Sequence, residues 1–141
     1  MVAQTRRFSS CLAGIEPGAV PLLVGSLALI GSDEPTILAA IDVTAIGSLE
    51  PHVLVLDVDA LTTDPLETIR MVRFLLRSGV IAIFTGRCEQ SWGLACHLAG
   101  ANCLLNSRGS EDRTAIGLLH GIRSGCYTDP AFEAAPLKEA S

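Results

Sequence analysis

Short apolar segments alternate with longer amphipathic segments along most of the chain. The apolar segments are too short for exposed helices, and continuous apolar runs of this length are typical of strands buried on both faces. We predict strands at residues 8–13, 27–30, 53–56, 80–84 and 103–105, with helices in the gaps between them. This alternation predicts an α/β domain: a doubly wound, parallel five-stranded sheet with helices on both faces, in three layers.

Helix start and stop signals lie between the predicted strands. Asp64 can cap a helix that ends near Gly79, because a proline and then a glutamate follow it in the first turn. Two further helices are predicted over 89–99 and 111–124. Residues 18–25 stay open between a short helix and a loop, because their proline and glycines disfavour a helix.

The chain is long enough for one domain, which we place over residues 8–127. Residues 1–7 are then an N-terminal extension. Residues 128–141 contain two prolines, four alanines and mixed charges, which are typical of a C-terminal linker or tail.

Composition narrows the classes of function. Of 141 residues, 49% are hydrophobic and 18% charged, too apolar a balance for a disordered protein. A net charge of −5 and an aromatic content of 4% argue against direct nucleic-acid binding. The uncharged run over 17–32 is short and broken by prolines and glycines, so no membrane span is expected. Hydrolase, dinucleotide and Walker motifs are absent and no C-x-x-C pair occurs, so we expect a cytoplasmic protein that is not an enzyme.

The candidate chemistry lies just after the predicted strands. In an open parallel sheet, the loops at the carboxyl ends of the strands form the ligand crevice. The polar and small residues at these positions are Gly14, Ile15, Glu16, Ser32, Asp33, Asp57, Asp59, Thr85, Gly86, Asn106 and Ser107. None of the three histidines is at such a position, which disfavours a histidine catalyst or metal ligand.

Short motifs at these strand ends resemble a known family in their order and spacing. The chain resembles the receiver (CheY-like) domain of two-component response regulators in VLVLD (53–57), DPLE (64–67), FT (84–85), GA (100–101) and LL (104–105). It resembles the NarL/FixJ, or LuxR-type, class in the ending GCYTDP (125–130). The resemblance implies that Asp57 is at the phosphoacceptor position and Thr85 at the switch position. The aromatic residue that often serves the switch in the family is replaced by Cys103.

The resemblance also implies that the phosphorylation pocket is degenerate. Gly14 and Ile15 stand where the family carries the acidic pair that holds Mg²⁺. Asn106 and Ser107 stand where it carries a lysine. The residues of this degenerate pocket are Gly14, Ile15, Glu16, Asp59, Asn106 and Ser107. We expect no cofactor beyond weak Mg²⁺ binding at Asp57.

These features predict an atypical signal-receiver module with a transcriptional output, working through dimerisation or partner contacts without conventional phosphorylation. The last helix has more than one apolar stripe, so we expect a homodimer through Ile116, Leu119 and Ile122. A DNA-binding domain after the chain, and a histidine kinase or other regulator, are the partners that the resemblance implies. Two alternatives stay open: the pocket binds a small-molecule effector, or Asp57 is phosphorylated as in a typical response regulator.

Overall fold

The computed structural model describes residues 7–134. Its centre is a parallel sheet in the order β2-β1-β3-β4-β5-β6. The strands are β1 (Ser10–Ala13), β2 (Thr36–Leu38), β3 (Val53–Leu56), β4 (Val80–Thr85), β5 (Cys103–Asn106) and β6 (Tyr127–Thr128). The helices are η1 (Pro17–Ala19), α1 (Val20–Leu29), α2 (Val43–Leu49), α3 (Pro65–Leu75), α4 (Gln90–Ala99), α5 (Glu111–Ser124) and α6 (Pro130–Ala134). The doubly wound α/β prediction is confirmed, with six strands in place of five.

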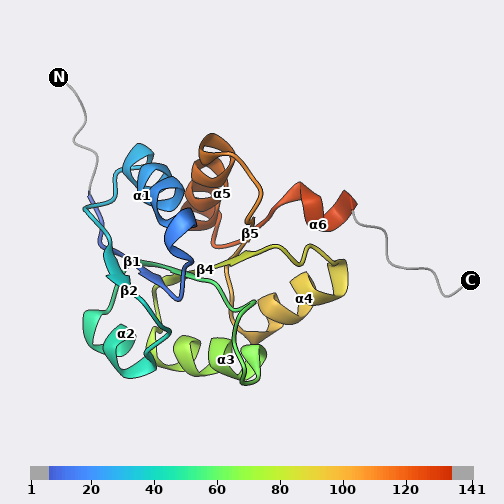
Figure 1. Ribbon diagram of the computed structural model, residues 1–141, viewed down its shortest axis with the longest axis horizontal. Helices are drawn as coiled ribbons and strands as arrows, with labels where there is room; N and C mark the ends of the chain where they lie inside the picture. Colours follow the sequence, from blue (N-terminus) through green and yellow to red (C-terminus); the bar gives the residue numbers. More distant parts are fainter. Residues whose placement is uncertain (1–6, 135–141) are drawn as a thin grey trace, which may run out of the picture.

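The helices form one layer on each face of the sheet (Figure 1). Helices α1 and α5 cover one face, where they pack on alternate strand residues such as Val53 and Val55. Helices α2, α3 and α4 cover the other face, where Leu54 and Leu56 are buried. Because consecutive residues of β3 enter opposite cores, the strand is apolar throughout.

The strand predicted at 27–30 is wrong. Residues 27–29 are the last turn of α1, and the second strand of the sheet is β2. Helix α1 is apolar almost all round, and a short apolar run in such a helix cannot be distinguished from a buried strand by periodicity. Strand β2 was missed because it is a short edge strand in which Ile37 is 54% exposed.

The three predicted helices are confirmed, with one change at an end. The Asp64 side chain accepts hydrogen bonds from the first-turn amides of α3, as its capping role requires. The helix ends at Leu75, before Gly79. The Arg73 guanidinium donates to the carbonyls of Leu76 and Gly79, so this side chain holds the chain in a turn where the helix would otherwise continue.

The linker predicted after residue 127 is wrong for residues 128–134, which are packed on the domain. Strand β6 pairs with β5, and α6 packs on α4. Phe132 of α6 is 1% exposed and lies against Gly93 of α4. The buried Asp129 carboxylate accepts two hydrogen bonds from the Arg113 guanidinium. Only Arg7 of the predicted N-terminal extension is described, and residues 135–141 lie outside the described residues.

Within residues 7–134, every helix is too short or too polar to cross a bilayer.

Candidate functional site

The carboxyl ends of the strands surround a hollow of about 620 Å³. It is lined by Gly14, Ile15, Glu16, Pro17, Ala19, Ala39, Asp57, Asp59, Ala60, Phe84 and Ser107. The structure therefore brings together six of the residues that the sequence analysis placed at strand ends. Ala39 was missed because it follows β2, the strand that the apolar pattern did not reveal.

Five of the predicted strand-end residues do not line this hollow: Ser32, Asp33, Thr85, Gly86 and Asn106. Asp33 pairs with Arg7 at 2.6 Å, and Ser32 forms a bridge with Phe8, ahead of β1. Both follow the helix α1 instead of a strand, so they stand at the opposite edge of the sheet. Asn106 does not line the hollow, and its side-chain oxygen accepts a hydrogen bond from the Arg108 amide at 3.0 Å.

Two hydrogen bonds, one from its backbone amide and one to its side chain, hold Asp57 directly after the C-terminal end of β3. Its amide donates to the Ala13 carbonyl at 3.3 Å. Its Oδ1 accepts a hydrogen bond from the Asp59 amide at 2.9 Å. Burial raises the pKa of the Asp57 carboxyl above its ordinary value, the Asp59 amide opposes this, and the carboxylates of Asp59 and Glu16 raise the pKa further. Among the described residues, no cation pairs with Asp57 within 4.0 Å.

The Asp59 carboxylate faces β4 instead of Asp57. Its Oδ1 accepts a hydrogen bond from the Thr85 hydroxyl at 2.6 Å, and its Oδ2 accepts one from the Gly86 amide at 2.8 Å. Thr85 is fully buried, and its hydroxyl oxygen accepts from the Arg87 amide at 3.0 Å. The sequence analysis placed Asp59 in the degenerate pocket beside Asp57. Its contacts with β4 depend on a loop conformation that the sequence pattern does not encode.

The Arg108 guanidinium lies near Gly86 and Asp59 and outside the hollow that holds Asp57. A Cβ added at Gly86 would be 3.6 Å from Nη2 of Arg108 and 3.8 Å from Oδ2 of Asp59. Arg108 lines a second hollow, of about 440 Å³, with Asp59, Gly86 and Trp92. It does not line the hollow that holds Asp57. Within residues 7–134, Asn106 and Ser107, which stand where the resemblance places a lysine, supply no positive charge, and Arg108 lines the other hollow.

The residues present do not fit a resident divalent cation. In residues 7–134, no three acidic, histidine or cysteine side chains are grouped closely enough to hold a metal ion. Gly14 has a φ of +70°, and a Cβ there would lie 2.9 Å from the Ile41 side chain and 3.3 Å from the Asp57 carbonyl oxygen. An acidic side chain at position 14 would therefore strain both the backbone and the packing.

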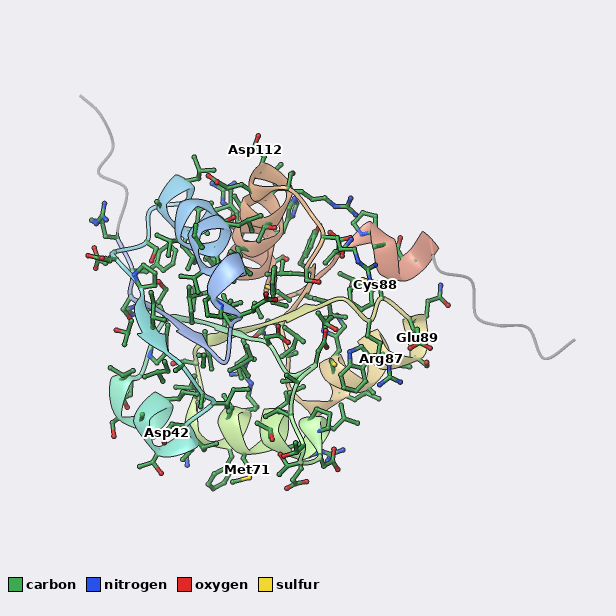
Figure 2. All side chains as sticks on the ribbon, in the orientation of Figure 1. Asp42, Met71, Arg87, Cys88, Glu89 and Asp112 are labelled. Atoms are coloured by element: carbon green, nitrogen blue, oxygen red, sulfur yellow. The ribbon has the colours of Figure 1, made fainter. Side chains whose placement is uncertain are left out.

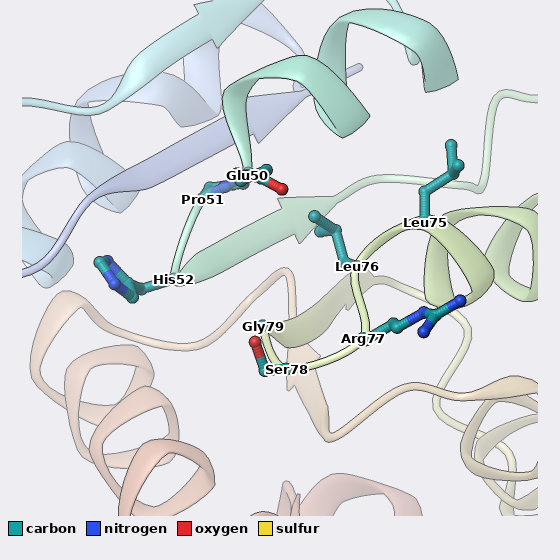
Figure 3. A pocket seen from close by; sticks show the side chains of 8 residues that line it. All are labelled: Glu50, Pro51, His52, Leu75, Leu76, Arg77, Ser78 and Gly79. Atoms are coloured by element: carbon teal, nitrogen blue, oxygen red, sulfur yellow. The ribbon is translucent and has the colours of Figure 1, made fainter.

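A third hollow, of about 420 Å³, lies where β3 and β4 begin (Figure 3). It contains His52 and Arg77, which point away from each other (Figure 3). Nδ1 of His52 is already within 3.1 Å of the Ser9 amide and 3.0 Å of the Ser9 hydroxyl. Its polar groups do not converge on a common point, so the hollow at the strands' carboxyl ends stays the candidate site.

The predicted dimer residues are on α5, in different surroundings. Ile116 is 56% exposed, beside the 59% exposed Leu29 of α1. Both line an apolar hollow of about 340 Å³, together with the half-buried Leu119. Ile122 instead packs partly buried against the core between the sheet and α1.

Solved structures with the same fold include receiver domains of response regulators. A LuxR-family response regulator from Aurantimonas matches with a TM-score of 0.70 at 16% identity, covering 92% of this chain and 94% of that one. The isolated receiver domain of RcsB from Salmonella enterica, solved with phosphomimetic BeF₃⁻, matches with a TM-score of 0.74 at 17% identity, covering 92% and 98%. A longer RcsB structure from Salmonella typhimurium matches with a TM-score of 0.73 at 17% identity, covering 91% of this chain and 64% of that one.

The chain has the fold of a response-regulator receiver domain. At these identities, the likeness establishes the fold alone. The sequence matches no described protein family and no curated protein. Asp57 directly follows β3 and Thr85 ends β4, and these two strands are neighbours in the sheet.

Proposed function

We propose that this receiver-fold domain is the signal-receiving module of a two-component-type transcriptional regulator and acts without phosphorylation of Asp57. The observation that carries the proposal is the charge around Asp57. Its near charged neighbours are the carboxylates of Glu16 and Asp59, and no cation pairs with it among the described residues.

This charge balance opposes phosphoryl transfer to Asp57. A phosphoryl group adds a charge of about −1.5 to −2 and needs positive groups or hydrogen-bond donors around its oxygens. Here it would enter a hollow that already holds three carboxylates. Receiver domains that accept phosphate meet this demand with Mg²⁺ and a lysine, which the residues at positions 14, 15, 106 and 107 do not replace.

Without phosphorylation, the signal must come through contacts with other molecules. We propose a homodimer through the apolar hollow between α1 and α5, where Leu29 and Ile116 are both more than half exposed. Exposed apolar patches of this kind favour protein contacts. In the full protein, a C-terminal DNA-binding domain would turn this contact into a transcriptional output in the cytoplasm, and another regulator or a kinase would be a binding partner.

Mass spectrometry of the intact protein tests the phosphorylation claim. The purified domain is incubated with Mg²⁺ and acetyl phosphate, beside Asp57→Ala and a phosphorylatable receiver domain as the positive control. We expect no added phosphoryl mass on this chain while the positive control is modified. An adduct that forms on the parent and is lost in Asp57→Ala would show a working phosphorylation site and overturn the proposal.

Sedimentation of charge variants tests the dimer. Ile116→Asp is expected to give a folded monomer. Leu98→Asp is the matched control, because Leu98 is 80% exposed on α4, outside the proposed contact. Dimers that survive Ile116→Asp but dissociate with Leu98→Asp would place the contact on α4 instead.

A second candidate function is binding of a small-molecule effector in the 620 Å³ hollow. Its volume and its apolar lining by Ile15, Ala39 and Phe84 favour this reading, because ligand sites are mostly apolar with a few polar groups. A ligand that binds only the folded state raises the melting temperature. A thermal-shift screen of metabolites should then yield a compound whose effect disappears when Ala39 is replaced by a bulky residue.

A further inference from the structure

The Asp59 carboxylate joins two loops of the candidate site. Asp59 follows β3, whereas both of its donors, the Thr85 hydroxyl and the Gly86 amide, are at the end of β4. The two distances, 2.6 and 2.8 Å, are typical of hydrogen bonds to a charged acceptor. Because each carboxylate oxygen has its own donor, the Asp59 side chain has one defined orientation.

Neither of these donors is free to bind a group attached to Asp57. A hydroxyl group has a single hydrogen to donate, and that of Thr85 is directed to Asp59. The Gly86 amide is likewise engaged. The Asp59 amide binds Oδ1 of Asp57, so the same residue binds Thr85 and Gly86 with its side chain and Asp57 with its backbone.

Thr85 is connected in turn to the surface formed by α4 and α6. Its hydroxyl oxygen accepts from the Arg87 amide, and the Arg87 guanidinium lies 4.5 Å from the centre of the Trp92 ring in α4. The next residue, Gly93, touches Phe132, since a Cβ at Gly93 would be 3.0 Å from the Phe132 ring. Figure 2 shows Arg87 and Cys88 at the start of α4, on the side where α6 lies.

We infer that the Asp59 carboxylate is a permanent hydrogen-bond partner of Thr85 and holds the loop after β4 in one arrangement. Through this loop it also holds the α4–α6 surface in one arrangement, without modification of Asp57. This inference rests on the proposed function and adds how a receiver without phosphorylation keeps a defined surface. The stacking of Arg87 on Trp92 connects the loop to that surface. Cys103 cannot make this connection, because it is a small residue buried under α5.

Amide hydrogen exchange and chemical shifts measured by NMR test the inference. Asp59→Ala should speed exchange of the Gly86 amide by roughly tenfold, the loss expected for one charged hydrogen bond. It should also shift the amides of Arg87, Trp92 and Phe132. Thr85→Val should shift the same three amides, and Thr85→Ser should restore the parent spectrum.

Two comparisons separate a specific effect from general loosening. Asp42→Ala is the matched control, because Asp42 also accepts an amide hydrogen bond at a helix start, in α2, and its loss should leave Gly86 unchanged. Combining Asp59→Ala with Thr85→Val should produce no larger shifts at Trp92 than either change alone.

The two proposals fail in different ways. If Asp59→Ala alters Gly86 but leaves Trp92 and Phe132 unchanged, Asp59 is only a local cap and the inference is overturned, while the proposed function stands. A phosphoryl adduct on the parent protein overturns the proposed function, whatever the spectra show. Additive shifts in the double variant would also contradict the inference.

Discussion

Replacing Gly121 of α5 by alanine should destabilise the domain by about 2 kcal/mol. An added Cβ would lie 1.8 Å from Sγ of Cys103, which is fully buried in β5. Overpacking a core costs roughly 1–3 kcal/mol, and so short a contact argues for the upper value. The higher helix propensity of alanine offsets about 1 kcal/mol of that cost.

Urea unfolding measures this loss of stability, and a second substitution, Cys103→Ala, shows whether the contact with Cys103 causes it. In the double variant Gly121→Ala with Cys103→Ala, the sulfur is gone and the nearest atom of residue 103 is Cβ, at 3.5 Å. The double variant should therefore be about 1 kcal/mol more stable than Cys103→Ala alone, because only the helix-propensity gain remains, which gives a coupling of about 3 kcal/mol. Gly47→Ala in α2 is the control, because its Cβ would meet Leu75 at an ordinary 3.4 Å. Additive losses, or a Gly121→Ala variant as stable as Gly47→Ala, would refute the packing argument.

Three further predictions concern the tail, the site and the thiols. Phe132→Ala should lower the free energy of unfolding by about 3–5 kcal/mol in urea titrations, because it empties a fully buried position; an unchanged value would mean that α6 is not part of the core. Because burial raises the Asp57 pKa, the folded state binds its proton more tightly and ionisation disfavours folding. Asp57→Asn should therefore be more stable than the parent at neutral pH. The difference should shrink as the pH falls through the raised folded-state pKa and be gone below the unfolded-state value of about 3.9, where Asp57 is protonated in both states; equal stability at every pH would contradict the burial argument. Maleimide should label the exposed Cys126 rapidly and Cys103 only after unfolding, since burial raises the pKa of the Cys103 thiol to about 12; mass spectrometry of the labelled peptides checks this, and early labelling of Cys103 would contradict it.

The fold could be predicted where local pattern and global position agree. Strands β3 and β4 are continuous apolar runs because both faces of the sheet are covered. The same logic failed for α1, which is as apolar as a buried strand although residues such as Leu29 are exposed. It also failed for β2, because an edge strand has little buried surface to impose a pattern.

The sequence was enough to predict several residues that line the site, but it was not enough to predict the hydrogen bonds between them. Parallel strands bring their carboxyl ends together, so the order of strands is enough to place Asp57 near Ile15. Whether the Asp59 carboxylate turns toward Asp57 or toward Thr85 depends on loop torsions that leave no mark in the sequence. The packing of Phe132 on the domain could not be predicted from the sequence either, because a five-residue segment rich in alanine is also typical of a C-terminal tail.

A titration of the ¹⁵N-labelled domain with Mg²⁺ and beryllofluoride measures whether Asp57 can hold a phosphoryl group, because beryllofluoride binds an aspartate that is equipped to do so. We predict that the amides of Asp57, Asp59 and Gly86 keep their chemical shifts at concentrations that saturate a phosphorylatable receiver domain. Saturable shifts at these amides, abolished by Asp57→Ala, would show that the pocket accepts a phosphoryl group and that the proposed function is wrong.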